Sequence, residues 1–366
     1  MKSISNYRGC LLGGAAGDAL GYAVEFMSAD RIFKKYGESG ITEYELRNGV
    51  AQISDDTQMT LFTANGLLLG TTRGKMRGAS ETYPGCIAIS YKDWLRTQFE
   101  CYPLPDDDHY SWLVNMPELF NSRAPGHTCV SAIRGGCNGT IAKPVNFSKG
   151  CGGVMRVAPI GLYRPSRHCG ESDDMIGAQA AALTHGHELG YIPAAALVHI
   201  ISLVSHEDIS LLDAVNDAIF AAQKLFAWAD CLGEFTDIMN KAVALARSDM
   251  TDLEAIRRIG EGWVAEECLA IAVYCALKYD NDFDKALIAA VNHSGDSDST
   301  GAVTGNILGA YLGAEGIPQK YLDNLELRDV IVELADDLYY DCQMSECSSC
   351  EDEVWEKKYV KNTYKM

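Results

Sequence analysis

The chain has 366 residues, of which 31 are Lys or Arg and 50 are Asp or Glu, giving a formal net charge of -19. Such acidity excludes binding of a nucleic-acid backbone as the main activity, because nucleic-acid binders usually present a basic face. Length alone allows one large domain or two ordinary ones. The sequence indicates neither a signal peptide nor an apolar run of membrane-spanning length. A cytoplasmic protein with no nucleic-acid or membrane partner is therefore expected.

Glycines at every fourth position mark the first predicted helix and recur near the end of the chain. The first set is Gly9, Gly13, Gly17 and Gly21, and the second is Gly301, Gly305, Gly309 and Gly313. A glycine inside a helix costs about 1 kcal/mol relative to alanine, and only close backbone packing offsets that cost. The spacing predicts two central helices, each with a flat face.

Residues 71–127 interrupt the helical pattern with TRGKMRGASETYPG, PLPDDDHYSW and NSRAPGH, which are rich in proline, glycine and charge. A long irregular segment inside a compact domain is usually functional or mobile. Helical sequence continues on both sides, so the segment is interpreted as a lid-like insertion in one domain spanning 1–340.

Apolar residues at three- and four-residue intervals predict helices through most of the remaining sequence. The segments are 173–185, 191–206, 211–233, 234–246, 266–279, 283–293 and 327–341. Alternating strands are scarce, so the predicted fold class is all-α. A solvated tail, 341–366, is expected to follow. Its cysteines 342, 347 and 350 have a spacing that suits a metal, but no fourth ligand lies nearby.

Three acidic clusters are candidates for chemistry: Glu25, residues 54–57 (SDDT) and residues 296–300 (DSDST). Each cluster alone is explained as a helix N-cap, because Ser, Thr and Asp accept hydrogen bonds from the free amides of a first turn. Together they offer the carboxylate and hydroxyl oxygens that magnesium, manganese and calcium prefer. An EF-hand is excluded, because Ile307 stands where its final glutamate is required.

A glycine-rich stretch, FSKGCGGVMRVAPIGL at 147–162, suits either an anion-binding loop or a tight structural turn. It lacks the Gly-Lys-Ser/Thr ending of a Walker motif, and no GxGxxG or HExxH pattern occurs. His185 and His187 are candidate ligands for substrate or metal, although histidines at a helix end more often cap it. Cys151 has no histidine at a readable spacing, so a cysteine nucleophile is disfavoured.

The order of these motifs resembles the ADP-ribosylglycohydrolase family, which includes dinitrogenase reductase-activating glycohydrolase and ADP-ribosylarginine hydrolases. The matching pieces are GCLLGGAAGDALGYAVEF, SDDTQMT, GHTCVSAIRGG, SKGCGGVMRVAPIGL, ALTHGH, GEGWVAEECLAIAVYCAL and HSGDSDSTGAVTGNILGAYLG. They span residues 9 to about 315. The resemblance implies a single orthogonal helical-bundle domain with two Mg²⁺ or Mn²⁺ ions in a central cleft.

The resemblance also implies roles for individual residues. The metal ligands are Ser54, Asp55, Asp56, Asp296, Asp298 and Ser299, with serine at the last position where threonine is more usual. The catalytic residues are Glu25, Asp55, Asp56 and Asp296. The pyrophosphate cradle is Ser148, Lys149, Gly150, Cys151, Gly152 and Gly153, and His185 lies near the adenosine portion of the substrate.

The implied activity is metal-dependent hydrolysis of the N-glycosidic bond between ADP-ribose and arginine on modified proteins, reversing mono-ADP-ribosylation. The substrate is then an ADP-ribosylated protein, the product is ADP-ribose, and a cognate ADP-ribosyltransferase is a candidate partner. Three alternatives stay open. They are hydrolysis of serine-linked or small-molecule ADP-ribose conjugates, non-catalytic ADP-ribose binding, and phosphoryl transfer, which the absence of a nucleotide triphosphate motif disfavours.

Overall fold

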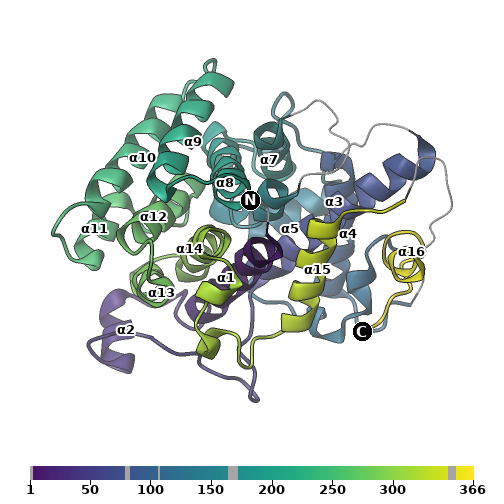
Figure 1. Ribbon diagram of the computed structural model, residues 1–366, viewed down its shortest axis with the longest axis horizontal. Helices are drawn as coiled ribbons and strands as arrows, with labels where there is room; N and C mark the ends of the chain where they lie inside the picture. Colours follow the sequence, from purple (N-terminus) through teal and green to yellow (C-terminus); the bar gives the residue numbers. More distant parts are fainter. Residues whose placement is uncertain (1–2, 79–82, 106–107, 164–171, 345–351) are drawn as a thin grey trace.

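The computed structural model describes residues 3–78, 83–105, 108–163, 172–344 and 352–366, and within these the architecture is all-α (Figure 1). The first helices are α1 (Ile4–Gly21), α2 (Ala29–Tyr36), α3 (Asp55–Arg77), α4 (Tyr83–Phe99), α5 (His127–Arg134), α6 (Ala158–Leu162), α7 (Asp173–Ala182) and α8 (Glu188–His206). They are followed by α9 (Leu211–Leu225), α10 (Leu232–Ala246), α11 (Asp252–Ile259), α12 (Ala265–Lys278), α13 (Phe283–Val291), α14 (Ser297–Leu312), α15 (Arg328–Tyr340) and α16 (Glu353–Tyr359). The predicted fold class is confirmed.

The two glycine-faced helices, α1 and α14, lie side by side at the centre of the molecule (Figure 1). A Cβ atom placed on Gly13 would lie 2.3 Å from the Gly305 carbonyl oxygen, and one on Gly17 would lie 2.0 Å from the Gly301 carbonyl oxygen. Backbone therefore packs on backbone, which confirms the close packing that the spacing predicted. The end of α1 reaches the start of α14, since a Cβ on Gly21 would lie 2.2 Å from the Ser297 carbonyl oxygen.

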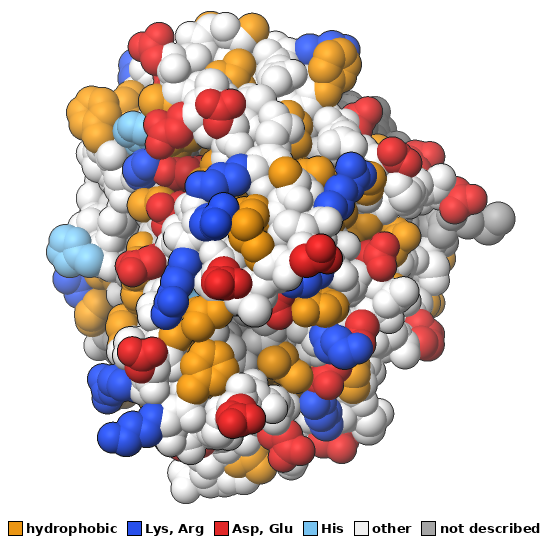
Figure 2. Space-filling view, turned by 90° about the vertical axis from the view of Figure 1, so that its left-hand side faces the viewer, with side chains coloured by type: hydrophobic (Ala, Val, Ile, Leu, Met, Phe, Trp, Pro, Cys, Tyr) orange, Lys and Arg blue, Asp and Glu red, His pale blue; other side chains and the backbone are white. Residues whose placement is uncertain are grey.

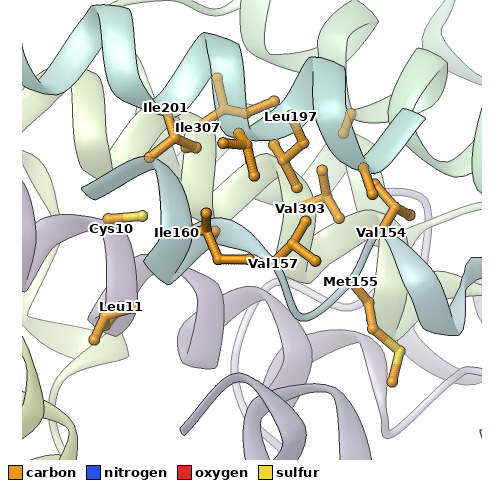
Figure 3. Close-up of a cluster of buried hydrophobic side chains, with 14 of the residues drawn as sticks. Cys10, Leu11, Val154, Met155, Val157, Ile160, Leu197, Ile201, Val303 and Ile307 are labelled. Carbon is orange, nitrogen blue, oxygen red and sulfur yellow. The ribbon is translucent and has the colours of Figure 1, made fainter. Parts of the chain in front are cut away.

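Helix α8 packs against α7, α9 and α14 and is the most apolar part of the core. Among the described helices it alone is long and apolar enough to cross a membrane, but 89% of that window is buried inside the fold. Figure 3 shows its side chains interleaved with those of neighbouring elements: Leu197 and Ile201 from α8, Val154, Val157 and Ile160 from the segment before it, and Val303 and Ile307 from α14. Burial of this kind is typical of a core helix.

The face shown in Figure 2 carries acidic and basic side chains interspersed with isolated apolar ones. No single sign of charge dominates that face, although the whole chain is strongly acidic. Six acidic side chains described below are instead buried, each with less than a tenth of its surface exposed. The buried acids therefore need an explanation beyond solubility.

The expectation of an irregular lid over 71–127 is wrong for most of the described residues before 100, because α3 continues to Arg77 and α4 is a buried helix. Gly78 ends α3 in the left-handed conformation with φ 60°, and Pro84 lies in the first turn of α4, where a missing amide costs nothing. The helices approach closely, because a Cβ on Gly66 would lie 2.6 Å from the Cα of Ile87. Gly78 and Pro84 therefore mark helix ends and not irregular chain.

The expectation of a solvated tail is wrong for one face of α16, although most residues of 352–366 are exposed. Trp355 of α16 is buried and its Nε1 donates to Thr72 Oγ1 of α3 at 3.0 Å. Lys358 is buried as well and pairs with Asp337 of α15 at 2.7 Å. Cys342 is buried, whereas Cys347 and Cys350 lie outside the described residues, so the disfavoured metal site at these cysteines is not tested.

A histidine connects three helices of the fold by hydrogen bonds. His199 of α8 bonds Asp174 of α7 and Asp217 of α9, each at 2.8 Å. Burial opposes charge on this imidazole, but the two carboxylates outweigh it and raise the pKa of His199. Because its pKa is higher in the folded than in the unfolded protein, the charged imidazole stabilises the fold fully below the unfolded pKa of about 6.5. This stabilisation is lost as the pH rises through the folded pKa.

The variant His199→Gln is therefore expected to be less stable than the native protein at pH 6, by under about 1 kcal/mol because Asp217 is exposed. The difference should shrink when thermal unfolding is repeated at pH 9. An equal difference at both pH values would contradict a charged His199.

Candidate active site

The N-terminus of α3 is fixed by a buried aspartate that the sequence analysis did not single out. Asp18 of α1 is fully buried and accepts hydrogen bonds from the backbone N–H of Ser54 at 2.9 Å and of Thr57 at 3.0 Å. Burial and the charge of Asp298 raise the pKa of Asp18 to about 7. The sequence signal for Asp18 was an acidic residue within an otherwise apolar, glycine-faced helix. Asp18 thereby aims Asp55 and Asp56.

The N-cap explanation applies to one acidic cluster and not to the other. At α3 the Ser54 hydroxyl accepts from the backbone N–H of Asp56 at 3.2 Å, which is a capping bond. Asp296 occupies the N-cap position of α14, yet its side chain makes no capping hydrogen bond. Its Oδ2 instead accepts from the Cys151 thiol at 2.7 Å. The Asp296 side chain is therefore free of a capping role.

Five acidic residues from three elements line one cavity of about 270 Å³: Glu25, Asp55, Asp56, Asp296 and Asp298. Glu25, Asp296 and Asp298 each offer a carboxylate oxygen within 4.8 Å of the others. No lysine or arginine is among the described lining residues. Burial, followed by the charge of Asp298, raises the pKa of Glu25 to about 10 and holds the pKa values of Asp55, Asp56 and Asp296 well above their usual range.

These residues fit a bound divalent cation. Glu25 Oε2 and Asp56 Oδ2 are buried and have no hydrogen-bond partner among the described residues, which is costly for a polar atom. Cations bound in the cavity would satisfy such oxygens and relieve the repulsion among the acids. The set consists of carboxylate oxygens and the Ser299 hydroxyl, and such hard ligands suit magnesium or manganese better than zinc.

Of the six predicted metal ligands, all but one reach the cavity. Asp55, Asp56, Asp296, Asp298 and Ser299 line it, whereas Ser54 does not. Ser54 is fully buried, and its hydroxyl hydrogen-bonds Asp298 in addition to capping α3. Direct ligation by Ser54 stays a prediction, and the structure gives it a supporting position beside a candidate ligand.

The predicted pyrophosphate cradle lines the cavity only in part. Gly150, Cys151 and Gly152 line the cavity, whereas Ser148, Lys149 and Gly153 do not. Lys149 pairs with Glu266, and the Ser148 hydroxyl accepts from the Gly150 amide at 3.3 Å. The Cys151 amide donates to the Trp263 carbonyl at 3.1 Å. Two of the loop amides are therefore already used, and anion binding at this loop needs other donors as well.

His185 supplies a side chain beside that loop. It is 2% exposed, lines the cavity, and lies so close that a Cβ on Gly150 would be 3.3 Å from its Nε2. His187, the other candidate, caps α8 instead, because its Nδ1 accepts from the backbone N–H of Leu189 at 3.1 Å. The capping alternative therefore holds for His187, and His185 remains at the site.

Two aromatic rings that the sequence analysis did not identify also line the cavity. Phe26 follows Glu25 directly, and Trp263 precedes α12. The rings are stacked, with centroids 6.0 Å apart and an interplanar angle of 19°. Phe26 is 70% exposed and Trp263 is 40% exposed, so both rings stand at the solvent side. They lie on segments far apart in the sequence, and spacing alone could not pair them.

The site combines a buried acidic cluster with a glycine loop in an all-α fold. Comparison with known proteins identifies the family. The family description "ADP-ribosylglycohydrolase" matches residues 1–347. The chain belongs to the ADP-ribosylglycohydrolase family.

Its relatives include named hydrolases. The chain is 26% identical to the mouse (Mus musculus) ADP-ribosylhydrolase ARH3, over 89% of this chain and 88% of the relative. It is 27% identical to the ADP-ribosyl-[dinitrogen reductase] glycohydrolase of Rhodospirillum rubrum, over 87% and 90%. It is 23% identical to the ADP-ribosylarginine hydrolase Tri1 of Pseudomonas putida, over 92% and 79%.

A solved structure described as an ADP-ribosylglycohydrolase-related protein complex shares the fold, with a TM-score of 0.59 and 22% identity. The likeness covers 92% of this chain and 98% of that one. Family membership supports hydrolase activity on ADP-ribose conjugates. The names of the relatives differ in the conjugate, so membership alone does not select the linkage.

Proposed function

We propose that the protein hydrolyses the N-glycosidic bond between ADP-ribose and arginine on modified proteins, in a reaction that depends on a divalent cation. The observation that carries this proposal is the composition of the cavity. Five buried acidic residues, part of a glycine loop and His185 line the same cavity. The acids suit cations and ribose hydroxyls, and the loop with His185 suits an anionic oxygen.

The acidic residues Asp55, Asp56, Asp296 and Asp298 would hold the cation. When bound, a divalent cation compensates their charge and makes nearby water more acidic. Asp18 and Ser54 hold the start of α3 so that Asp55 and Asp56 stay directed into the cavity. Phe26 and Trp263 add apolar surface at the solvent side, where they would limit the access of bulk water to a bound ligand.

In the hydrolysis, the oxygen of a water molecule forms a bond to the anomeric carbon of the ribose. The bond from that carbon to the guanidine nitrogen breaks, and its electron pair stays on the nitrogen, which takes up a proton. The water loses a proton to a carboxylate. Glu25 suits that role once a cation is bound, because its Oε2 is buried without a partner and a nearby positive charge would lower its raised pKa. Cleavage passes through an oxocarbenium-like state, which the surrounding negative charge stabilises.

The test measures free ADP-ribose after incubation of the purified protein with arginine-, serine- and phosphate-linked ADP-ribose. Release from the arginine conjugate is expected in magnesium or manganese, with loss on exhaustive chelation and recovery when the metal is restored. Full activity after chelation would contradict the cation requirement. Release from the serine conjugate alone would favour the O-linked alternative, and no release from any conjugate would favour a binding protein.

A further inference from the structure

A buried arginine behind the glycine loop lacks an acidic partner. Arg156 has none of its surface exposed and lies 4.6 Å from the ring centroid of Tyr91. Its Nη1 contacts Cys129 Sγ at 3.3 Å, and the same sulfur would lie 2.7 Å from a Cβ on Gly152. No carboxylate pairs with Arg156 in the described part of the chain. A buried charge without a counter-ion is costly, which points to a role for it.

The contacts of Arg156 fix the direction of a hydrogen-bond chain. Its Nη2 donates to Thr184 Oγ1 at 2.6 Å, and a guanidinium can only donate. Thr184 Oγ1 lies 2.8 Å from His185 Nδ1 and 3.5 Å from the Ala181 carbonyl, and it also contacts the Cys129 sulfur. The carbonyl is the weaker alternative by distance, and a sulfur is a weak acceptor beside a ring nitrogen. The single hydroxyl proton of Thr184 is therefore directed to Nδ1, and the Nδ1 atom accepts.

An accepting Nδ1 places the one ring proton of neutral His185 on Nε2. That nitrogen lies beside Gly150 and Gly152, and it has no hydrogen-bond partner among the described residues. Burial, together with the charge of Arg156, lowers the pKa of His185 to about 3. The imidazole thus stays neutral and presents an N–H group to the cavity, next to a loop whose amides are already partly used.

We propose that Arg156 is a positioning residue that acts through Thr184 to hold His185 as the Nε2–H tautomer, which donates to an anionic oxygen of the ligand at Gly150–Gly152. The identity of that oxygen, a diphosphate oxygen of ADP-ribose, rests on the proposed function. The tautomer itself does not. A neutral donor suits a cavity with five acids, because a charged imidazolium would pair with a carboxylate instead.

The tautomer is measured from ¹⁵N chemical shifts of protein labelled at histidine, with His185 assigned by its absence in His185→Asn. Native protein should show a protonated Nε2 and an unprotonated Nδ1. Thr184→Ser keeps the hydroxyl and should show the same pattern. Thr184→Val removes the hydroxyl at nearly constant volume and should give a mixture of tautomers, as should Arg156→Met. If Arg156→Met fails to fold, the comparison of Thr184→Val with Thr184→Ser still tests the proposal.

The ligand step is measured as the Kd for ADP-ribose in magnesium. Thr184→Val should bind about tenfold more weakly than native protein, because one oriented donor to a charged oxygen is lost, and Thr184→Ser should bind within about twofold. A native Nδ1–H tautomer, or identical shifts and affinity in Thr184→Val, would overturn the proposal. If native protein binds no ADP-ribose, the proposed function fails, while the tautomers still uphold or overturn the positioning by Arg156.

Discussion

The variant Asp296→Asn is expected to lose hydrolytic activity by about a hundredfold to a thousandfold, the scale seen when one electrostatic contact to a transition state is removed. In chelator, however, the same variant should melt at an unchanged or higher temperature. Burial and the nearby charge of Asp298 hold the pKa of Asp296 well above its usual range, so its charge destabilises the metal-free fold. An asparagine relieves that repulsion, and no capping bond is lost.

The same variant distinguishes a metal ligand from a structural aspartate. With magnesium well above its dissociation constant, native protein should gain about 1 to 3 kcal/mol by binding linkage, and Asp296→Asn should gain much less. Thermal unfolding of both proteins in chelator and in magnesium measures this. Asp249 is exposed and distant in sequence from Asp296, so Asp249→Asn is the matched control, and its melting temperature should shift with magnesium as that of native protein does. Equal magnesium shifts in native protein and Asp296→Asn would show that Asp296 is not a ligand.

The variant Gly305→Ala is expected to lower the free energy of unfolding by about 3 kcal/mol or more, at the upper end of overpacking costs. The added Cβ would lie 1.9 Å from the Gly13 carbonyl oxygen, and backbone cannot yield as a flexible side chain can. Helices α1 and α14 would have to separate, which would also move Asp296 and Asp298 away from Glu25. Urea unfolding and the activity assay should therefore both report the change.

A matched glycine provides the control for that experiment. Gly233 lies in the first turn of α10, and a Cβ placed on it would point into open space. Gly233→Ala is expected to be neutral or to stabilise by up to about 1 kcal/mol, since alanine has the higher helix propensity. A tolerated Gly305→Ala, with an effect near that of Gly233→Ala, would contradict the described packing.

The glycine-faced helices were predictable because their cause is local. A four-residue spacing places Gly13 and Gly305 on helix faces by geometry alone, and only close packing explains the cost. The gathering of Glu25, Asp55 and Asp296 was not predictable from spacing, because about 240 residues separate the last two. Family resemblance suggested that gathering, and the structure shows the shared cavity. The metal-ligand and catalytic roles themselves stay predictions.

Other features were out of reach because they depend on tertiary contacts. Pro84 and Gly78 predicted irregular chain, but they stand at helix ends, and the close approach at Gly66 then buries α4. Asp18 and Arg156 were visible as charges within apolar sequence, yet their hydrogen-bond partners lie on other elements. Side-chain networks of this kind become visible only when the elements are packed.

The contact between α1 and α14 can form only late in the synthesis of the chain. Helix α1 leaves the ribosome first, but its flat partner begins at Ser297, after most of the chain has been made. Long-range contacts of this kind form late and slow folding, because a large loop must close first. A nascent chain that stops before α14 carries Glu25 and Asp55 without Asp296 and Asp298, and its glycine face is uncovered. Such a fragment exposes surface that the complete fold covers, and the cavity exists only once both ends of the domain have met.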